Sequence, residues 1–141
     1  IDTFCQNWYT VKNVIIERSK KMGKFVVREV SSGIKFDLKA TNGQVIASSE
    51  VYKSKASCLK GVNSVINNAP IANLEDQTVE DFKVEKNPKF EIYNDKAGEF
   101  RFRLKAKNGE IIATSEGYKT MDSCKNGVES VRKNAANSAI E

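Results

Sequence analysis

The sequence predicts an α+β fold of two tandem βββα repeats, each with a three-stranded antiparallel sheet and one helix, packed as a pseudo-twofold unit. Three observations support this prediction. A long segment is written twice, its centre alternates between apolar and charged residues, and a helical stripe of small apolar residues follows in each copy. The 141 residues suffice for one ordinary domain or two small ones.

The duplication is clearest in two stretches of twenty residues. KFDLKATNGQVIASSEVYKS occupies residues 35–54, and RFRLKAKNGEIIATSEGYKT occupies residues 101–120. From Phe36 and Phe102 onward, matching positions lie 66 residues apart. Because a single repeat is too small to bury enough apolar surface to be stable alone, we expect the two copies to form one core together.

Composition and charge divide the chain into four parts. We expect an N-terminal extension of unassigned origin at 1–21, the first repeat at 22–69, an acidic linker at 70–88 and the second repeat at 89–141. The first repeat carries seven basic and three acidic side chains, whereas the linker carries two basic and five acidic ones. The chain as a whole has a net charge of +5. The basic repeats can therefore attract polyanions, although basic small domains are also common without that role.

The elements of each repeat follow from periodicity and turn residues. The second strand of the second repeat alternates, with Phe and Leu side chains on one face and basic side chains on the other. The Asn-Gly pair that follows indicates a hairpin turn with positive φ. The register of the third strand stays open, because loops of two and three residues turn opposite faces inward. The expected strands around it are 25–30 and 45–49 in the first repeat and 90–94 and 111–115 in the second, with helices beginning at Ser54 and Thr120.

A stripe of small apolar residues on each helix is expected to face the sheet. Its members are spaced four, three and four residues apart. A glycine within each helix costs about 1 kcal/mol relative to alanine, so its presence in both copies indicates that another element packs closely against it. The expected core residues are Phe36, Leu38, Cys58, Gly61, Val62 and Val65 in the first repeat and Phe102, Leu104, Cys124, Gly127, Val128 and Val131 in the second.

Similar tails follow the two helices, IANLE in the first copy and NSAIE in the second. They align Leu74 with Ile140. One interpretation is a short extra strand after each helix, paired with the sheet of the other repeat.

The second copy, from Phe90 to Ala135, carries a specific pattern. It reads F-x-I-Y-x-D-x-A-G-E-F-R-F-R-L-K-A-x-N-G-E-x-I-A-x-S-E-x-Y and then C-x-x-G-V-x-S-V-x-x-N-A. This pattern resembles the YegP-like family, also called DUF1508 or UPF0339. The first copy departs from it, because it lacks both arginines and has Val51 where the family has glycine. The resemblance implies a small ββαβ or βββα domain of bacterial type, often in tandem or dimerised, and implies no established activity.

Several classes of function are disfavoured by composition. The chain has no histidine, which removes His-assisted nucleophiles and His-ligated metals. Its three cysteines, Cys5, Cys58 and Cys124, contain no CxxC pair, and such a sparse set suits a reducing compartment. No apolar run has the length of a membrane span. We therefore expect a cytoplasmic protein that is not an enzyme, with no cofactor, no bound metal and no membrane partner.

A basic strand face is the sharpest candidate site. The candidate anion-binding or nucleic-acid-binding residues are Arg101, Arg103, Lys105, Lys107, Lys119 and Thr120. The first four share one strand face, and the last two precede a helix N-terminus with free N–H groups. The alternatives are that Glu110 and Glu116 on the neighbouring strand pair with the basic face, and that Thr120 only caps the helix.

We expect, on balance, a non-catalytic interaction or assembly module of unknown specific role. It would form a homo-oligomer or dock a protein partner through its sheet edges or through residues 1–21. The alternative is a weak polyanion or nucleic-acid binder that uses the basic strand face of the second repeat, with nucleic acid the less favoured partner.

Overall fold

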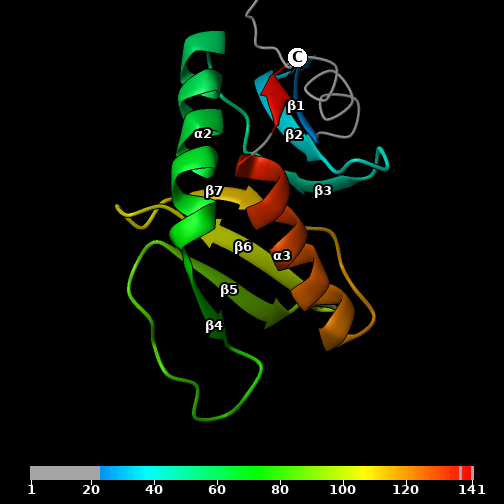
Figure 1. Cartoon of the computed structure of the whole chain (residues 1–141), viewed down its shortest axis with the longest axis vertical. Helices are drawn as coiled ribbons and strands as arrows, with labels where there is room; N and C mark the ends of the chain where they lie inside the picture. Colours follow the sequence, from blue (N-terminus) through cyan, green and yellow to red (C-terminus); the bar gives the residue numbers. More distant parts are fainter. Residues whose placement is uncertain (1–22, 137, 141) are drawn as a thin grey trace, which may run out of the picture.

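A computed structural model describes residues 23–136 and 138–140, so the expected extension at 1–21 lies outside the described residues. The fold is α+β, with one eight-stranded sheet whose order is β4-β5-β6-β7-β3-β2-β1-β8 and two helices on one of its faces (Figure 1). The elements are β1 (Lys24–Val30), β2 (Gly33–Lys39), β3 (Val45–Ser48), α2 (Lys55–Asn68), the 3-10 turn η1 (Ala69–Ile71), β4 (Asn73–Asp76), β5 (Lys89–Asn94), β6 (Phe100–Lys105), β7 (Ile111–Thr114), α3 (Met121–Ala136) and β8 (Ala139–Ile140).

The two halves of the chain, residues 23–76 and 89–140, pair their strands in the same way. β1 runs antiparallel to β2, β2 to β3, β5 to β6 and β6 to β7. The halves meet in the middle of the sheet, where Ser48 of β3 pairs with Thr114 of β7. These two residues lie 66 positions apart, which is the offset of the sequence duplication.

Each half adds a short strand to the edge of the other half. β4 follows α2 and pairs in parallel with β5, so that Leu74 lies beside Phe90. β8 follows α3 and pairs in parallel with β1, so that Ile140 lies beside Phe25. The structure thus differs from two separate three-stranded sheets: there is one sheet, and part of the expected linker at 70–88 is the strand β4.

An irregularity in the third strand explains why its register could not be derived from the sequence. Leu104 pairs with Ala113, but the next residue, Lys105, pairs with Ile111, so one residue of β7 is extra. As a result, the consecutive residues Ile112 and Ala113 are both buried. A strict alternation of inward and outward residues fails at such a bulge.

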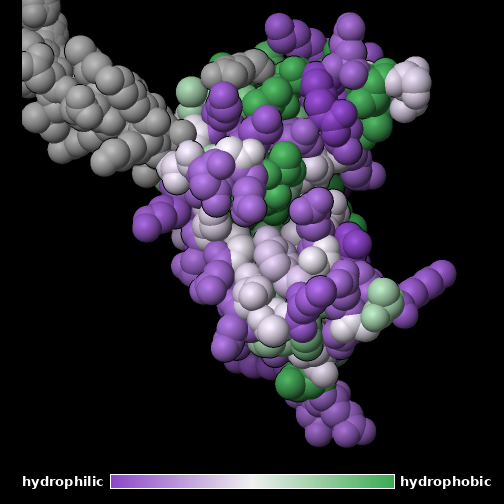
Figure 2. All heavy atoms as spheres, turned by 90° about the vertical axis from the view of Figure 1, so that its right-hand side faces the viewer, coloured by the Kyte–Doolittle hydropathy of each residue, from purple (hydrophilic) through white to green (hydrophobic). Residues whose placement is uncertain are grey.

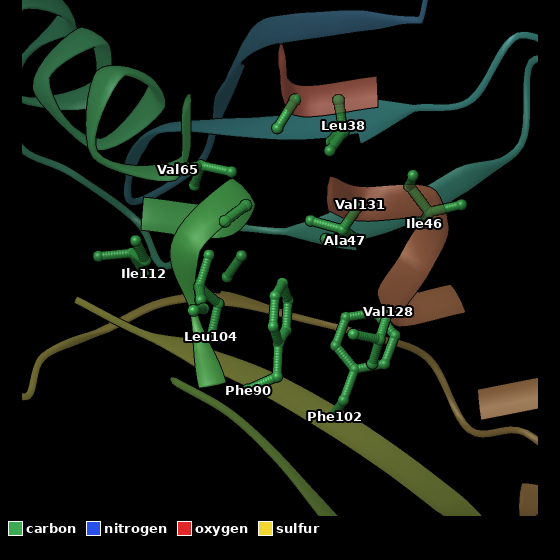
Figure 3. Close-up of a cluster of buried hydrophobic side chains, with 14 of the residues drawn as sticks. Leu38, Ile46, Ala47, Val65, Phe90, Phe102, Leu104, Ile112, Val128 and Val131 are labelled. Atoms are coloured by element: carbon green, nitrogen blue, oxygen red, sulfur yellow. The ribbon is translucent and has the colours of Figure 1, made fainter. Parts of the chain in front are cut away.

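The core is continuous across the two halves. Each of the residues that the sequence places in the core is buried. α2 contacts β2 in its own half and β7 in the other, while α3 contacts β6 and also reaches β2 and β3. Figure 3 shows one cluster of buried hydrophobic side chains. Leu38 and Val65 of the first half belong to it together with Leu104 and Val131 of the second half. The halves therefore bury their apolar surface against each other.

The glycine in each helix makes room for an aromatic stack. In the first half the rings of Phe36 and Tyr52 are stacked with centroids 6.4 Å apart, and Phe102 and Tyr118 repeat this arrangement at 6.2 Å. A Cβ atom on Gly61 would lie 2.3 Å from the Tyr52 hydroxyl. The equivalent glycine of α3 is blocked in the same way, at 2.5 Å. Glycine therefore allows both helices to approach the stacks.

Strand β4 is held to β5 by the buried carboxylate of Glu75. Glu75 is 2% exposed and accepts hydrogen bonds from Lys89 Nζ at 2.8 Å, Gln77 Nε2 at 2.6 Å and the N–H of Glu85 at 2.7 Å. Burial by itself raises the pKa of Glu75, but these donors outweigh it and lower the pKa to about 2. The ion pair between Glu75 and Lys89 therefore holds β4, a strand of the first half, against β5 of the second half.

We predict that Gly61→Ala destabilises the protein by about 2 kcal/mol, because overpacking against Tyr52 outweighs the better helix propensity of alanine. Urea unfolding measures the free energy of unfolding. The matched control is Asn63→Ala at an exposed position of the same helix, which we expect to be neutral or slightly stabilising. A Gly61→Ala protein more stable than the wild type would contradict the close approach.

We predict that Glu75 makes folding stability sensitive to acid. Because its folded-state pKa of about 2 lies below the ordinary 4.5, its contribution is complete above about pH 5 and is lost as the pH falls through 2. Glu75→Gln should lower the free energy of unfolding at pH 7 by about 3 kcal/mol and flatten its acid dependence. Denaturant unfolding from pH 7 to pH 2 tests this, with the exposed Glu80→Gln as control. An unchanged acid dependence in Glu75→Gln would refute the assignment.

Candidate binding face of the sheet

Both helices cover the same side of the sheet, so the opposite side, here called the open face, is left uncovered by them and faces away from the viewer in Figure 1. Since Phe36 and Phe102 point toward the helices, the residues that alternate with them lie on the open face. The open face carries eight basic residues against four acidic ones. The basic residues are Lys24, Arg28, Lys35, Lys39, Lys89, Arg101, Arg103 and Lys105, and the acidic ones are Asp37, Glu75, Glu91 and Asp95, the last in the turn after β5.

The basic residues of β6 are held by carboxylates from β5 and its following turn. Arg101 Nε donates to Asp95 Oδ2 at 2.7 Å, and Arg103 Nε donates to Glu91 Oε1 at 2.6 Å. Lys105 Nζ lies 3.3 Å from the other oxygen of Glu91. The three basic side chains are therefore fixed in place on the sheet while still partly exposed.

The partners expected from the sequence, Glu110 and Glu116, were the wrong ones. Glu110 lies in the turn after β6 and accepts a hydrogen bond from Asn108 Nδ2 at 2.9 Å. Glu116 lies beyond the end of β7 and is exposed. The carboxylates come instead from β5, on the other side of β6, because cross-strand pairing places Glu91 directly opposite Arg103.

The first half has an ion pair between its own two hairpin strands, but the two residues are diagonal neighbours, because Val26 and not Arg28 lies directly opposite Asp37. Arg28 Nε on β1 donates to Asp37 Oδ2 on β2 at 2.8 Å. Asp37 occupies the position of Arg103, and the sequence therefore suggested that the basic face is interrupted there. The interruption is compensated, since Arg28 supplies the guanidinium from the neighbouring strand. The alternation in β1 was the available signal for Arg28, and the turn length that sets its register was not known.

The buried charges on this face remain ionised near neutral pH. Burial raises the pKa of Glu91, but hydrogen bonds from Arg103 and Lys105 outweigh it and lower that pKa. Burial lowers the pKa of Lys89, but Glu75 and Glu91 outweigh it and raise that pKa. A network of opposite charges thus spans β4, β5 and β6.

The other expected anion-binding residues do not join this face. Lys107 is exposed in the turn after one end of β6. Lys119 and Thr120 lie at the opposite end, because the preceding Tyr118 pairs with Phe100. Thr120 caps α3 by accepting a hydrogen bond from the N–H three residues on, at 3.1 Å. The structure therefore brings together only the β6 part of the expected site.

The two described cysteines are buried residues of the helices. Cys58 belongs to α2 and Cys124 to α3, and burial raises the pKa of Cys124 to about 11, with Asp76 adding to the effect. At neutral pH such a thiol stays protonated and unreactive. Across residues 23–136 and 138–140, no group of three or more acidic or cysteine side chains is placed to hold a metal ion. Neither helix in this part of the chain has the length and apolarity needed to cross a membrane.

A crevice opens in the middle of the sheet, where β3 and β7 diverge beyond their single pair. Its volume is about 510 Å³, and Arg101 of the open face forms part of its wall. The remaining lining comes from β3, from the end of β7 and from the segment after it, and consists of Val45, Ala47, Ser48, Thr114, Ser115, Glu116 and Gly117. Sequence reasoning gave no sign of this crevice, because it depends on how the two halves meet.

The chain is related in sequence and in fold to known proteins. The model of a domain of unknown function, DUF1508, matches residues 31–76 and 95–141. The UPF0339 protein YegP of Yersinia pestis is 38% identical over 121 residues, which are 85% of this chain and 95% of that protein. The UPF0339 protein in the ptx operon 5′ region of Stutzerimonas stutzeri is 72% identical over 50 residues, but this chain covers only 45% of it.

A solved structure extends the likeness to the fold. The solution NMR structure of yegP from E. coli, described as a protein of unknown function, matches with a TM-score of 0.70 and 33% identity. The match covers 85% of this chain and 91% of that one. By sequence and by fold, the chain belongs to the DUF1508 (UPF0339, YegP-like) family, whose function is unknown.

Proposed function

We propose that this chain is a non-catalytic interaction module whose binding surface is the open face of the sheet. The observation that carries the proposal is the excess of basic over acidic residues on a face that neither helix covers. Such a surface attracts negatively charged macromolecules and raises their rate of association. The partner would therefore present a dense array of negative charges.

We read this face as the product of two βββα repeats related by a pseudo-twofold axis near Ser48 and Thr114. The shared pairing of the two hairpins and the 66-residue offset support this reading. Each repeat would then contribute one basic hairpin, with β4 and β8 exchanged between repeats. A partner would meet two similar binding surfaces side by side on one rigid sheet.

The non-catalytic part of the proposal rests on the state of the ionisable groups. The carboxylates of the open face are engaged in ion pairs, and the two described thiols are buried. Catalytic groups usually combine a perturbed pKa with access to a cleft, and these groups lack that access. Sparse cysteines suit a reducing compartment, so we also propose a cytoplasmic location.

We predict that Lys35→Glu/Lys39→Glu weakens retention on immobilised heparin, a polyanion, because it reverses two charges on the open face. The matched control is Lys60→Glu/Lys125→Glu, which makes the same change in net charge on the exposed sides of the helices. The measurement is the salt concentration needed for elution. Equal losses in the two variants would show that only net charge matters and would overturn the assignment to the open face.

Self-association at the β4 edge is a second candidate function, favoured by exposed aliphatic residues there. Ile71 is 60% exposed and Leu74, on β4 itself, is 38% exposed. Val79 and Val84 in the following loop are 52% and 70% exposed. An edge strand offers unpaired backbone groups as well, and a second copy of this chain would supply the matching edge.

If this candidate holds, the wild type should form a dimer that Ile71→Lys/Leu74→Lys dissociates, since buried lysines would face each other across the contact. Sedimentation equilibrium measures the change. Val51→Lys, at an exposed aliphatic residue away from β4, serves as the control. A wild-type chain that stays monomeric at high concentration would exclude self-association at the β4 edge. The proposal that the open face is a binding surface would not be affected by that result.

A further inference from the structure

Three arginines of the open face are held in a common way. Arg28, Arg101 and Arg103 each donate a hydrogen bond from Nε to one carboxylate oxygen, at 2.8, 2.7 and 2.6 Å. A guanidinium has a second hydrogen-bonding edge, formed by its two terminal amino groups. This shared contact fixes the orientation of each guanidinium and uses only its Nε side, not the second edge.

Among the described residues, these carboxylates make no hydrogen bond to the second edge, and their other oxygens contact other donors. Oδ1 of Asp37 accepts from the Ser48 hydroxyl at 2.7 Å. Oδ1 of Asp95 accepts from two backbone N–H groups, both at 2.9 Å. Oε2 of Glu91 lies 3.3 Å from both Lys89 Nζ and Lys105 Nζ. Each arginine is therefore bound by a single oxygen rather than by a two-pronged pair.

The terminal amino groups are largely available for a ligand. Among the described residues, Arg101 Nη1 donates to the carbonyl of Ser115 at 3.2 Å, and the terminal groups of Arg28 and Arg103 make no hydrogen bond. The arginine side chains are 47%, 38% and 28% exposed for Arg28, Arg101 and Arg103. The guanidinium of Arg103 also lies over the ring of Tyr93, 4.5 Å from its centroid, which limits its rotation.

We propose that these three arginines are oriented phosphate-binding groups and that the partner of the open face is the phosphate backbone of a nucleic acid. This inference rests on the proposed function and adds the chemistry of the partner. A planar guanidinium with a free terminal edge binds a phosphate through two parallel hydrogen bonds. The carboxylate on Nε acts as an outer support, which fixes the guanidinium before the ligand arrives.

The exchanged charges in the two halves support this role. Asp37 and Arg103 occupy the same position in the duplication, so the first half has an acid where the second has an arginine. Each half nevertheless keeps an arginine held through Nε on the open face, from β1 in the first and from β6 in the second. The feature common to both halves is the oriented guanidinium and not a particular residue position.

The open face favours a phosphate backbone over an acidic protein surface. Protein interfaces are usually anchored by apolar and aromatic side chains that become fully buried. The described hairpins offer few of these on the open face, since Phe36 and Phe102 point to the helices and the Tyr93 ring is covered by Arg103. Nucleic-acid backbones, by contrast, are bound mainly through cations. Because the described residues present no free aromatic ring on this face to stack on bases, binding should be independent of sequence.

The test uses the full chain and a fluorescently labelled single-stranded DNA of mixed sequence, with binding measured by anisotropy over a range of salt concentrations. Arg101→Lys/Arg103→Lys keeps both charges but removes the two-pronged geometry, so affinity should fall about tenfold with an unchanged salt slope. Arg101→Ala/Arg103→Ala removes two phosphate contacts, so the slope of log K against log salt should flatten by about 1.4. Lys60→Ala/Lys125→Ala on the helices is the control and should bind as the wild type does.

Thermal unfolding of each variant separates this role from a structural one, and the lysine variant retains a cation beside Glu91 if the alanine variant fails to fold. Wild-type affinity in the lysine variant would overturn the arginine inference, while the open-face proposal would stand if Lys35→Glu/Lys39→Glu still weakens binding. Retention on polyglutamate without DNA binding would identify an acidic protein partner and overturn the inference alone. Binding to none of the polyanions would overturn both proposals.

Discussion

The packing of both helices on the same face of one sheet is the constraint on which the rest of the structure depends. Because α2 and α3 each contact strands of both halves, the apolar residues of all the central strands must point to that one side. The aromatic stacks and the helix glycines follow from this, since the helices must come close enough to cover them. The residues that alternate with the core are then left on the opposite face, where most of them are polar or charged. The charged open face is thus a consequence of how the core is covered.

A uniformly basic sheet face would repel itself, and the structure avoids this by placing carboxylates among the cations. Glu91 sits between Lys89, Arg103 and Lys105, and Asp37 sits beside Arg28. The carboxylates are buried more deeply than the arginines they hold. This arrangement stabilises the sheet and leaves the outer parts of the basic side chains facing solvent. Hydrophilic residues also dominate the side of the molecule shown in Figure 2, where hydrophobic ones appear only in separate small groups.

Much of the fold could be predicted because each pattern could be compared between the two copies. The alternation in β6, the Asn-Gly turns and the helical stripe could all be recognised in the sequence, and the aligned tails suggested the extra strands. The bulge at Ile112 was not, because it breaks the alternation on which strand prediction depends. The partners of Arg101 and Arg103 were missed for a related reason. Which carboxylate faces an arginine is set by cross-strand register, and the turn leading from β5 to β6 is longer than the turn between β1 and β2.

The most direct test of the central claim, that the open face is the binding surface, is amide chemical-shift mapping by NMR during titration with single-stranded DNA at low salt. If the claim is right, the shifts should concentrate in β1, β2, β5 and β6, around Arg28, Arg101 and Arg103, and disappear as salt rises. The exposed sides of α2 and α3 should stay unchanged. Shifts confined to the helices or to the β4 edge would contradict the claim, because binding would then occur on a surface that the charges of the sheet do not define.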